Sequence, residues 1–396
     1  MTRPDALLFT NGQIVLPHRI ITEGSVLTNG NTIEAVAPGR IDAPHAETID
    51  LQGAFLCPGF IDIHIHGGAD ADFMDGTPEA FLTIARLHAR YGTTTLMPTT
   101  LSSTREELVR TLKAYAVAEP LNTDGAQFAG MHIEGPYFAQ AMRGAQDPRF
   151  IRDPDPAEYE ALVREFPHIK RWSAAPELKG AMAFGRFMRD HGVLPAFAHT
   201  QAVYADIEEA FANGYTLATH LYSAMSGVTR VKAHRYAGAV ESTFLIDEID
   251  AEIIADGIHL PAPLLKLIVK IKGPDRIALI TDAIRAAGMP PGPSRIGSRE
   301  NGMDIIVEEG VAKLTDRSSF AGSVATFDRL IRSMVRLAEV PLTDAVRMGS
   351  TTPARILGLQ HRKGSIGAGK DADLVVMDQD LKVTHTVVGG RILGRS

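Results

Sequence analysis

The sequence predicts an α/β protein in which a (β/α)8 barrel forms the centre and the two chain ends together form a small β domain. Three regions support this prediction. Apolar strand-like segments alternate with helix-like segments over residues 58–357, and both the first 57 residues and residues 358–396 are rich in short strands. Of the 396 residues, 45 % are hydrophobic, which is enough apolar material for a large core.

The chain ends carry the same local pattern. Short apolar runs over residues 6–16, 20–39 and 46–59 are broken by Asn-Gly pairs and single glycines of the kind that close tight turns. Residues 365–393 repeat this pattern. Neither end is long enough for a core of its own, so we expect residues 1–57 and 358–396 to pair as one domain. Two separate β caps are the alternative.

Eight strand candidates lie in the central region. They occupy residues 60–67, 93–99, 128–136, 171–177, 195–200, 216–222, 252–259 and 277–284. The helix-like segments between them often close with glycine, which is typical of a helix C-terminus. Eight such units within residues 58–357 favour a closed barrel, with a doubly wound open sheet as the rival.

The alternation is interrupted after the eighth strand. Residues 288–322 are rich in Pro and Gly at first and then carry the segment IIVEEGVAKL, which is typical of a β-hairpin. We therefore expect an insertion near residues 288–322 within the barrel.

Composition excludes several classes of function. The net charge is −7, from 40 basic and 47 acidic residues, and the absence of a long basic run argues against a nucleic acid partner. Cys57 is the single cysteine, so neither an intramolecular disulfide nor a cysteine zinc site is expected. The sequence shows neither a signal peptide nor a run of 18 apolar residues, so we expect a cytoplasmic protein with no membrane partner.

Histidine and acidic residues gather at the carboxyl ends of the predicted strands, where barrel enzymes hold their active sites. Singly, each histidine reads as a structural residue and the acidic residue of strand three as half of a salt bridge. Together they favour a metal site, because imidazole and carboxylate suit zinc, iron or manganese. The residues, in chain order, are His64, His66, Glu134, His199, His220 and Asp282.

This donor set predicts metal-dependent hydrolysis. A divalent ion lowers the pKa of a bound water and polarises a carbonyl group. A carboxylate beside the ion can accept the proton of that water and return it to a leaving amine. Asp282 is our candidate for this general acid and base, and metal ligation is its alternative or additional role.

At these residues the sequence resembles the amidohydrolase superfamily and, within it, the N-acetylglucosamine-6-phosphate deacetylases. The matching segments are, in chain order, PGFIDIHIHG, MHIEGP, AHT, ATHLYSAM, HRYAG, IIADGIH, ITDA, TPARILGL and GSIGAGKDADLVV. The resemblance implies a distorted (β/α)8 TIM-like barrel with a small β-sandwich domain formed from both chain termini. It also implies hydrolysis of N-acetylglucosamine 6-phosphate to glucosamine 6-phosphate and acetate.

The resemblance assigns a role to each metal candidate. Glu134, His199 and His220 would hold the main ion. Members of the family that keep the first-strand pair, here His64 and His66, can hold a second ion. One or two divalent ions per subunit are thus implied, with zinc favoured over iron and manganese, and Asp282 would be the catalytic acid and base.

Substrate-binding positions follow from the same resemblance. His259 and Arg235 match positions that bind the sugar phosphate, and arginine suits phosphate because its fork donates two hydrogen bonds. In relatives part of the phosphate site comes from the neighbouring subunit, which implies a homodimer. Two positions depart from the family pattern: Ser223 replaces an asparagine, although the backbone of Ala224 can still donate, and Gln146 replaces a histidine.

These departures leave the substrate open between glucosamine and galactosamine epimers, and between phosphorylated and unphosphorylated N-acyl amino sugars. A cyclic-amide hydrolase is disfavoured, because that branch needs a carboxylated lysine at the end of the fourth strand and Lys179 lies beyond it. An inactive scaffold is disfavoured as well, since every expected ligand position is filled.

Overall fold

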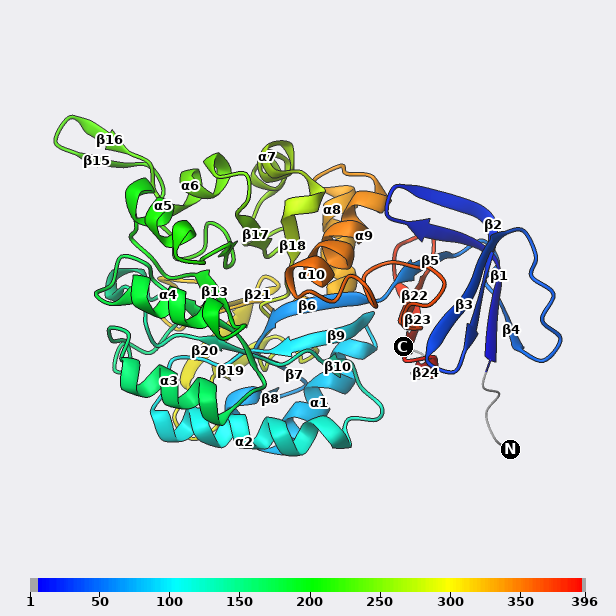
Figure 1. Cartoon of the computed structure of the whole chain (residues 1–396), viewed down its shortest axis with the longest axis horizontal. Helices are drawn as coiled ribbons and strands as arrows, with labels where there is room; N and C mark the ends of the chain where they lie inside the picture. The colour runs from blue at the N-terminus through cyan, green and yellow to red at the C-terminus, as the bar shows by residue number, and fades with distance from the viewer. Residues whose placement is uncertain (1–5, 394–396) are drawn as a thin grey trace.

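The computed structural model describes residues 6–393 and has an α/β fold (Figure 1). Residues 1–5 and 394–396, which include the outer limits of the predicted terminal domain, lie outside the described residues. A curled parallel sheet surrounded by helices forms the larger part. A second sheet, drawn in blue and red in Figure 1, combines strands from the first and the last parts of the described chain.

The second sheet has eight strands. Five come from the first part of the chain and three from the last: β1 (Ala6–Leu16), β2 (Arg19–Asn29), β3 (Thr32–Pro38), β4 (Glu47–Asp50), β5 (Phe55–Pro58), β22 (Leu374–Met377), β23 (Val383–Val388) and β24 (Arg391–Leu393). The order is β24-β23-β22-β5-β1-β2-β3, with β4 paired to β1. The antiparallel pair β5–β22 joins the two chain ends, and Phe9, Leu56 and Leu374 are buried together in its core.

The two Asn-Gly pairs of this region behave differently. Asn29 and Gly30 lie at the turn between β2 and β3, as predicted. The prediction of a break at Asn11 and Gly12 is wrong, because both residues lie inside β1, where its register with β2 shifts. Asn11 adopts a left-handed φ of 57°, and a Cβ on Gly12 would lie 2.3 Å from Leu51 Cδ1. The pair therefore forms a bulge that packs strand β1 closely against Leu51.

The central sheet has eight parallel strands, one within or overlapping each predicted strand segment. They are β6 (Phe60–Ile65), β9 (Thr93–Pro98), β11 (Met131–Glu134), β12 (Ile169–Ala174), β13 (Leu194–Phe197), β14 (Leu217–Ala218), β17 (Asp250–Ile253) and β18 (Ile277–Leu279). The short β10 (Gln127–Phe128), which precedes β11 in the chain, pairs with β9 in parallel. Every residue of β6, β9 and β11 is buried, including the polar residues Asp62, His64, His132 and Glu134.

Backbone contacts curl this sheet. Pairing runs from β6 to β9 and from β11 through β18, and a parallel bridge between Thr99 and His132 connects the two groups. Beyond β18, the N–H of Asp282 donates to the carbonyl of His64 over 2.9 Å. The last strand is thereby linked to the first, and the carboxyl ends of all eight strands meet at one end of the sheet.

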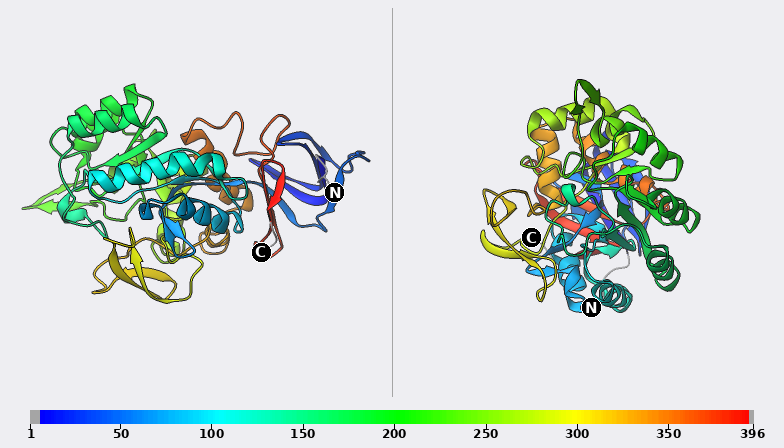
Figure 2. Two further views of the ribbon diagram at one scale, coloured as in Figure 1. Left: turned by 90° about the horizontal axis from the view of Figure 1, so that it is seen from below. Right: turned by 90° about the vertical axis from the view of Figure 1, so that its left-hand side faces the viewer.

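Helices lie around the curled sheet (Figure 2). Their bounds are α1 (Pro78–Ala89), α2 (Arg105–Leu121), α3 (Pro156–Glu165), α4 (Ala181–Asp190), α5 (Tyr204–Ala212), α6 (Ala239–Leu245), α7 (Ala262–Lys272), α8 (Phe327–Arg336), α9 (Leu342–Gly349) and α10 (Thr351–Ile356). Side-chain caps fix some of the starts. The side chain of Thr77 accepts from the N–H of Ala80 before α1, and Thr104 and Glu107 form a capping box at α2.

Two antiparallel elements project from this body. The segment predicted as an insertion contains β19 (Gly292–Ile296), β20 (Met303–Glu308) and β21 (Val311–Leu314); the expected hairpin is β20–β21, and β19 adds a third strand. A two-stranded arm, β15 (Thr229–Val231) and β16 (His234–Tyr236), extends away from the body in Figure 1 and is exposed along its length. Within residues 6–393, none of the helices is long and apolar enough to cross a membrane.

Candidate functional site

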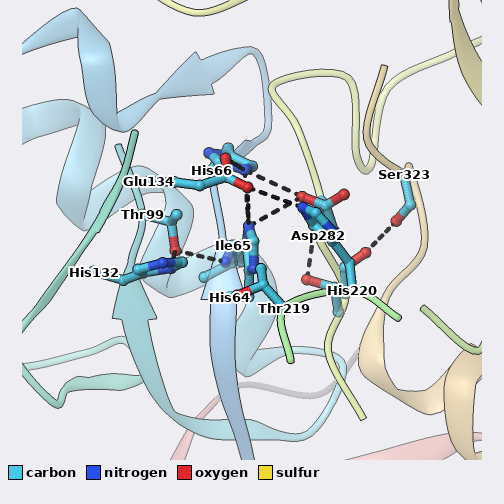
Figure 3. A network of polar contacts seen from close by, with 12 residues as sticks. His64, Ile65, His66, Thr99, His132, Glu134, Thr219, His220, Asp282 and Ser323 are labelled. Carbon is cyan, nitrogen blue, oxygen red and sulfur yellow. Dashed lines mark hydrogen bonds and ion pairs between the residues drawn. The ribbon is translucent and has the colours of Figure 1, made fainter. Parts of the chain in front are cut away.

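The curled sheet brings the six metal candidates together, and Figure 3 labels all of them except His199. His64 lies in β6 and His66 directly follows it, while Glu134 ends β11. His199, His220 and Asp282 lie two or three residues beyond β13, β14 and β18. All six residues are buried, so the strand ends converge on a single enclosed polar cluster.

Three of these residues hold an unusual backbone conformation. His199, His220 and Asp282 have φ angles of 47°, 34° and 48°, in the left-handed region that residues other than glycine seldom adopt. Each such residue costs about 1–3 kcal/mol and persists only where its surroundings impose it. The same local distortion beyond β13, β14 and β18 directs three polar side chains toward one centre.

The side chains form two overlapping groups that share Glu134. Glu134 Oε1 lies 3.0 Å from His220 Nε2 and 3.4 Å from His199 Nε2. Glu134 Oε2 lies 3.4 Å from His66 Nε2, which is itself 3.2 Å from His64 Nε2. The two groups are His64, His66 and Glu134, and Glu134, His199 and His220; within each, the candidate ligand atoms lie within 4.8 Å of one another.

This spacing fits a divalent ion. In a tetrahedral site with bonds of about 2.0–2.1 Å, neighbouring ligand atoms lie about 3.4 Å apart. The closest approaches in the cluster run from 3.0 to 3.5 Å, including Asp282 Oδ1 at 3.1 Å from His66 Nε2. Imidazole and carboxylate are also the donors that zinc, iron and manganese accept, so the described residues suit a metal centre.

The electrostatics of the cluster point the same way. Burial alone would raise the pKa of Glu134, but His64, His199 and His220 hold that pKa well below its ordinary value. Burial opposes the charge of Asp282 as well, yet the hydrogen bond with His66 keeps its pKa low. Burial would lower the pKa of His66, but Asp282 and Glu134 raise it to about 9. The two carboxylates therefore attract positive charge into the centre, which is the charge that a bound cation supplies.

Beside the cluster, His132 is a structural residue. Its Nδ1 lies 3.3 Å from Thr99 Oγ1, and its Nε2 lies 2.7 Å from Ser173 Oγ. Burial, together with the charge of Arg171, lowers the pKa of His132 well below its ordinary value. Both ring nitrogens are engaged away from the cluster, which leaves neither for a metal ion.

Two charged residues beneath the cluster were missed from the sequence. Glu252 Oε2 lies 3.5 Å from His64 Nδ1, and Arg171 pairs with both oxygens of Glu252. Both side chains are completely buried. The available signal was a charged residue at the first position of two predicted strand segments, Arg171 in residues 171–177 and Glu252 in residues 252–259.

A cavity of about 510 Å³ opens above the cluster. Of the predicted site residues, its lining includes His66, Glu134, Gln146, His199, His220, Ser223, Ala224, His259 and Asp282. His64 does not line it and is fully buried within the cluster. Arg235 lies on the exposed strand β16 and is not among the residues that line the cavity.

Gln146 and His259 are held by specific contacts. Gln146 Nε2 donates to Glu134 Oε2 over 2.7 Å, and the Ser102 N–H donates to Gln146 Oε1 over 2.8 Å. Gln146 is therefore fixed on a candidate metal ligand. Nδ1 of His259 lies 2.8 Å from Asp256 Oδ2, so the opposite ring nitrogen is left for a ligand in the cavity.

The insertion supplies lining residues that sequence reasoning missed. They are Ile296, Lys313, Arg317, Ser318, Ser319 and Phe320. The Phe320 ring packs on the ring of His259 with 4.7 Å between centroids. Lys313 and Arg317 both pair with Glu308, so their charge is compensated within the insertion.

Comparison with known proteins gives a consistent answer. Residues 55–393 match the Amidohydrolase family. The N-acetylglucosamine-6-phosphate deacetylase of Lysinibacillus sphaericus is 35 % identical over 356 residues, covering 89 % of each chain. The N-acetylgalactosamine-6-phosphate deacetylase of Escherichia coli O157:H7 is 34 % identical and covers 96 % of this chain and 98 % of that protein.

Solved structures agree with the sequence relatives. A mutant N-acetyl-D-glucosamine-6-phosphate deacetylase from Mycobacterium smegmatis, in complex with N-acetyl-D-glucosamine-6-phosphate, superimposes with a TM-score of 0.90 at 31 % identity. The match covers 98 % of this chain and 99 % of that one. The fold described above is thus shared over nearly its whole length with a protein of that name.

Proposed function

Since the chain belongs to the amidohydrolase family, we propose that it hydrolyses the N-acetyl group of N-acetylglucosamine 6-phosphate to give glucosamine 6-phosphate and acetate. The observation that carries the proposal is the buried cluster of Glu134, four histidines and Asp282 at the floor of a cavity. Relatives and structures of that name, matched over most of the chain, support the substrate.

The cluster would hold the metal. Glu134, His199 and His220 are the proposed ligands of a first ion, and His64 and His66 those of a second, with zinc as the favoured metal. Such an ion, when bound, lowers the pKa of water and polarises the acetyl carbonyl.

Asp282 is the proposed proton carrier. It lines the cavity, and its contact with His66 keeps its pKa below the ordinary value, so it stands ready as a carboxylate. In the proposed reaction Asp282 accepts a proton from the attacking water and delivers it to the sugar nitrogen as acetate departs. Asp282 also contributes an oxygen near both His64 and His66, so a ligand role is compatible with proton transfer.

The cavity also carries groups that suit the sugar phosphate. His259, oriented by Asp256, presents a ring nitrogen there, and Ser223 and the backbone N–H of Ala224 are further donors. We propose that these groups bind the 6-phosphate and thereby hold the acetyl group over the cluster.

An acetate-release assay tests the substrate. The metal-loaded protein is offered N-acetylglucosamine and N-acetylgalactosamine, each with and without the 6-phosphate. The proposal expects the highest kcat/KM for N-acetylglucosamine 6-phosphate. Release from unphosphorylated sugars alone would overturn the phosphate assignment of His259.

The galactosamine epimer is the second candidate. Two observations favour it: a relative of that name at 34 % identity, and the departures from the family pattern at Ser223 and Gln146 in the cavity lining. A higher kcat/KM for N-acetylgalactosamine 6-phosphate in the same assay would establish this candidate in place of the first.

The proposal extends to a homodimer. Arg235 sits on the exposed arm, whose neighbourhood also exposes the apolar residues Val228, Val231 and Tyr236. Such an arm suits insertion into a second copy of the chain, which would carry Arg235 to the partner's phosphate site. Mixing Arg235→Ala, which should have a raised KM, with the inactive Asp282→Asn tests this directly, because a mixed dimer would contain one complete site with the KM of the wild type.

Two features of the fold are inferred in the same way. We infer that the curled sheet and its helices, residues 58–357, are a distorted (β/α)8 TIM-like barrel, supported by the eight parallel strands and the link from Asp282 back to His64. We also infer that residues 1–57 and 358–396 are a separate β-sandwich domain, supported by the β5–β22 pair and its own apolar core.

A further inference from the structure

The buried pair of Arg171 and Glu252 has no role in the mechanism above. We propose that Glu252, neutralised by Arg171, is a positioning residue that fixes His64 as a metal ligand and so enables this chain to hold a second ion at His64 and His66. The inference rests on the proposed metal-dependent function, and it adds two residues outside the predicted donor set.

Contacts define the arrangement. Glu252 Oε2 lies 3.5 Å from His64 Nδ1, while the other nitrogen of that ring, Nε2, lies 3.2 Å from His66 Nε2. Arg171 donates from Nη2 to Glu252 Oε2 over 2.8 Å and also pairs with Glu252 Oε1. The Nδ1 edge of the His64 ring thus meets a charge pair, and its Nε2 edge points to the proposed second ion.

A carboxylate at Nδ1 has a specific consequence for a histidine ligand. The carboxylate accepts a hydrogen bond from Nδ1–H and so keeps the proton on Nδ1. The lone pair of Nε2 is then directed into the cluster, and Nε2 becomes a stronger metal ligand. Partners of this kind change metal affinity by about 10- to 100-fold. For His64 the effect acts on the second ion, because the first is held by Glu134, His199 and His220.

The other histidines of the cluster lack such a partner. His199 Nδ1 meets a neutral group, the Met142 carbonyl, at 2.9 Å. Nδ1 of His66 and Nδ1 of His220 are buried without a hydrogen-bond partner among residues 6–393. Within the described chain, His64 is therefore the ligand candidate whose orientation depends on a charged group.

Arg171 makes this carboxylate tolerable in the core. An isolated buried charge is strongly unfavourable, and Glu252 is fully buried beside a cluster that already holds Glu134 and Asp282. Arg171 compensates the charge of Glu252 and is itself anchored, through an Nη2 donation to Thr219 Oγ1 over 2.8 Å. Thr219 continues through Ser173 at 3.1 Å to His132 at 2.7 Å, so a fixed polar layer underlies the cluster.

The test measures metal binding rather than turnover. Metal-free wild-type protein and the double variant Arg171→Met/Glu252→Gln, which removes both charges together, are titrated with zinc in a metal buffer, and bound zinc per chain is counted by elemental analysis. We expect two ions in the wild type. In the double variant the second ion should bind about 10- to 100-fold more weakly, and the first should change less than about twofold.

A matched control separates positioning from general damage to the core. Lys363 and Asp373 are a second buried ion pair, next to the terminal sheet and outside the cluster. The variant Lys363→Met/Asp373→Asn removes a comparable pair and should leave both zinc affinities unchanged. Equal weakening of both ions in the Arg171/Glu252 variant, or no weakening at all, would overturn the inference.

A second variant covers the case in which the double variant does not fold. Glu252→Asp keeps the charge balance with Arg171 but withdraws the carboxylate from His64 by one methylene. It should weaken the second ion selectively, and two ions of wild-type affinity would contradict the proposal. A wild-type chain that binds one ion alone would also overturn it, whereas two bound ions without acetate release would overturn the proposed function and leave the positioning role standing.

Discussion

The strand ends and the substrate-reading loops of this protein are built on different principles. At the ends of five strands, six side chains converge within a buried cluster; each lies in a strand or at most three residues beyond it. On the substrate side, Ser223, His259 and the lining residues of the insertion come from separate loops, and Arg235 lies on an exposed arm. The chemistry thus belongs to the rigid sheet, and substrate selection belongs to elements that can vary independently.

The largest expected effect lies in the strand-end cluster. Asp282→Asn keeps the size of the side chain but removes its ability to accept a proton. Because general acid and base catalysis contributes about 10²- to 10⁴-fold, kcat should fall by that factor. Steady-state acetate release, with zinc content measured on the same samples, checks the result.

An exposed acidic residue provides the control for Asp282. Asp304→Asn, in β20 of the insertion, makes the same chemical change outside the cavity and should leave kcat unaltered. Near-wild-type kcat in Asp282→Asn with full zinc content would show that the proton carrier is another residue. The assignment of the proton transfer to the strand-end cluster would then be wrong.

Gln146 lies where the two regions meet. It comes from the substrate-side loop but donates to Glu134, so Gln146→Leu should act on metal binding rather than on substrate alone. Loss of a partner of a ligating carboxylate is expected to weaken zinc binding by about 10- to 100-fold. Zinc titration of the metal-free variant measures this. A raised KM with unchanged zinc affinity would instead show that Gln146 acts in substrate binding.

The arm provides a smaller and separable effect. If Arg235 serves the phosphate site of a second copy, Arg235→Ala should raise KM for the phosphorylated sugar by about tenfold, the lower range for a charge-assisted hydrogen bond, with kcat nearly unchanged. Arg230→Ala is a matched control, because Arg230 lies opposite Arg235 in the same arm. Equal effects of the two variants would indicate a general loss of positive charge rather than a specific contact.

The same contrast explains what the sequence could predict. The eight parallel strands and the residues His64, Glu134 and Asp282 could be predicted because short strand-like segments alternate with helix-like ones, and polar residues at the carboxyl ends of such strands are conspicuous. Local pattern could not reveal that Arg171 and Glu252 meet, since they lie 81 positions apart and pair only when the sheet curls.

Loop residues were harder for a related reason. The chain neighbours of Gln146 do not indicate that its amide turns toward Glu134, and the residues of the insertion become cavity lining only when β19–β21 lies beside the strand ends. Asn11 and Gly12 illustrate the same limit in the terminal sheet, where a turn-like pair forms a bulge because its neighbours continue the ladder. Side-chain type predicts chemistry, whereas placement in loops depends on tertiary contacts.

The smallest expected effect concerns Ser223. A substitution at this position tests whether a loop residue can change substrate binding without changing the catalytic rate. Ser223→Asn restores the amide that the family pattern carries at this position and adds a donor to the cavity. One additional hydrogen bond contributes about 0.5–1.5 kcal/mol, so KM for the phosphorylated sugar should fall about two- to tenfold. Because Ser223 makes no contact with the candidate ligand atoms described above, kcat and zinc content should stay at the wild-type level.

A comparison of KM for phosphorylated and unphosphorylated sugars checks the direction of this effect, since KM should fall only for the phosphorylated sugar. A change in kcat of similar size would mean that the loop and the cluster are coupled.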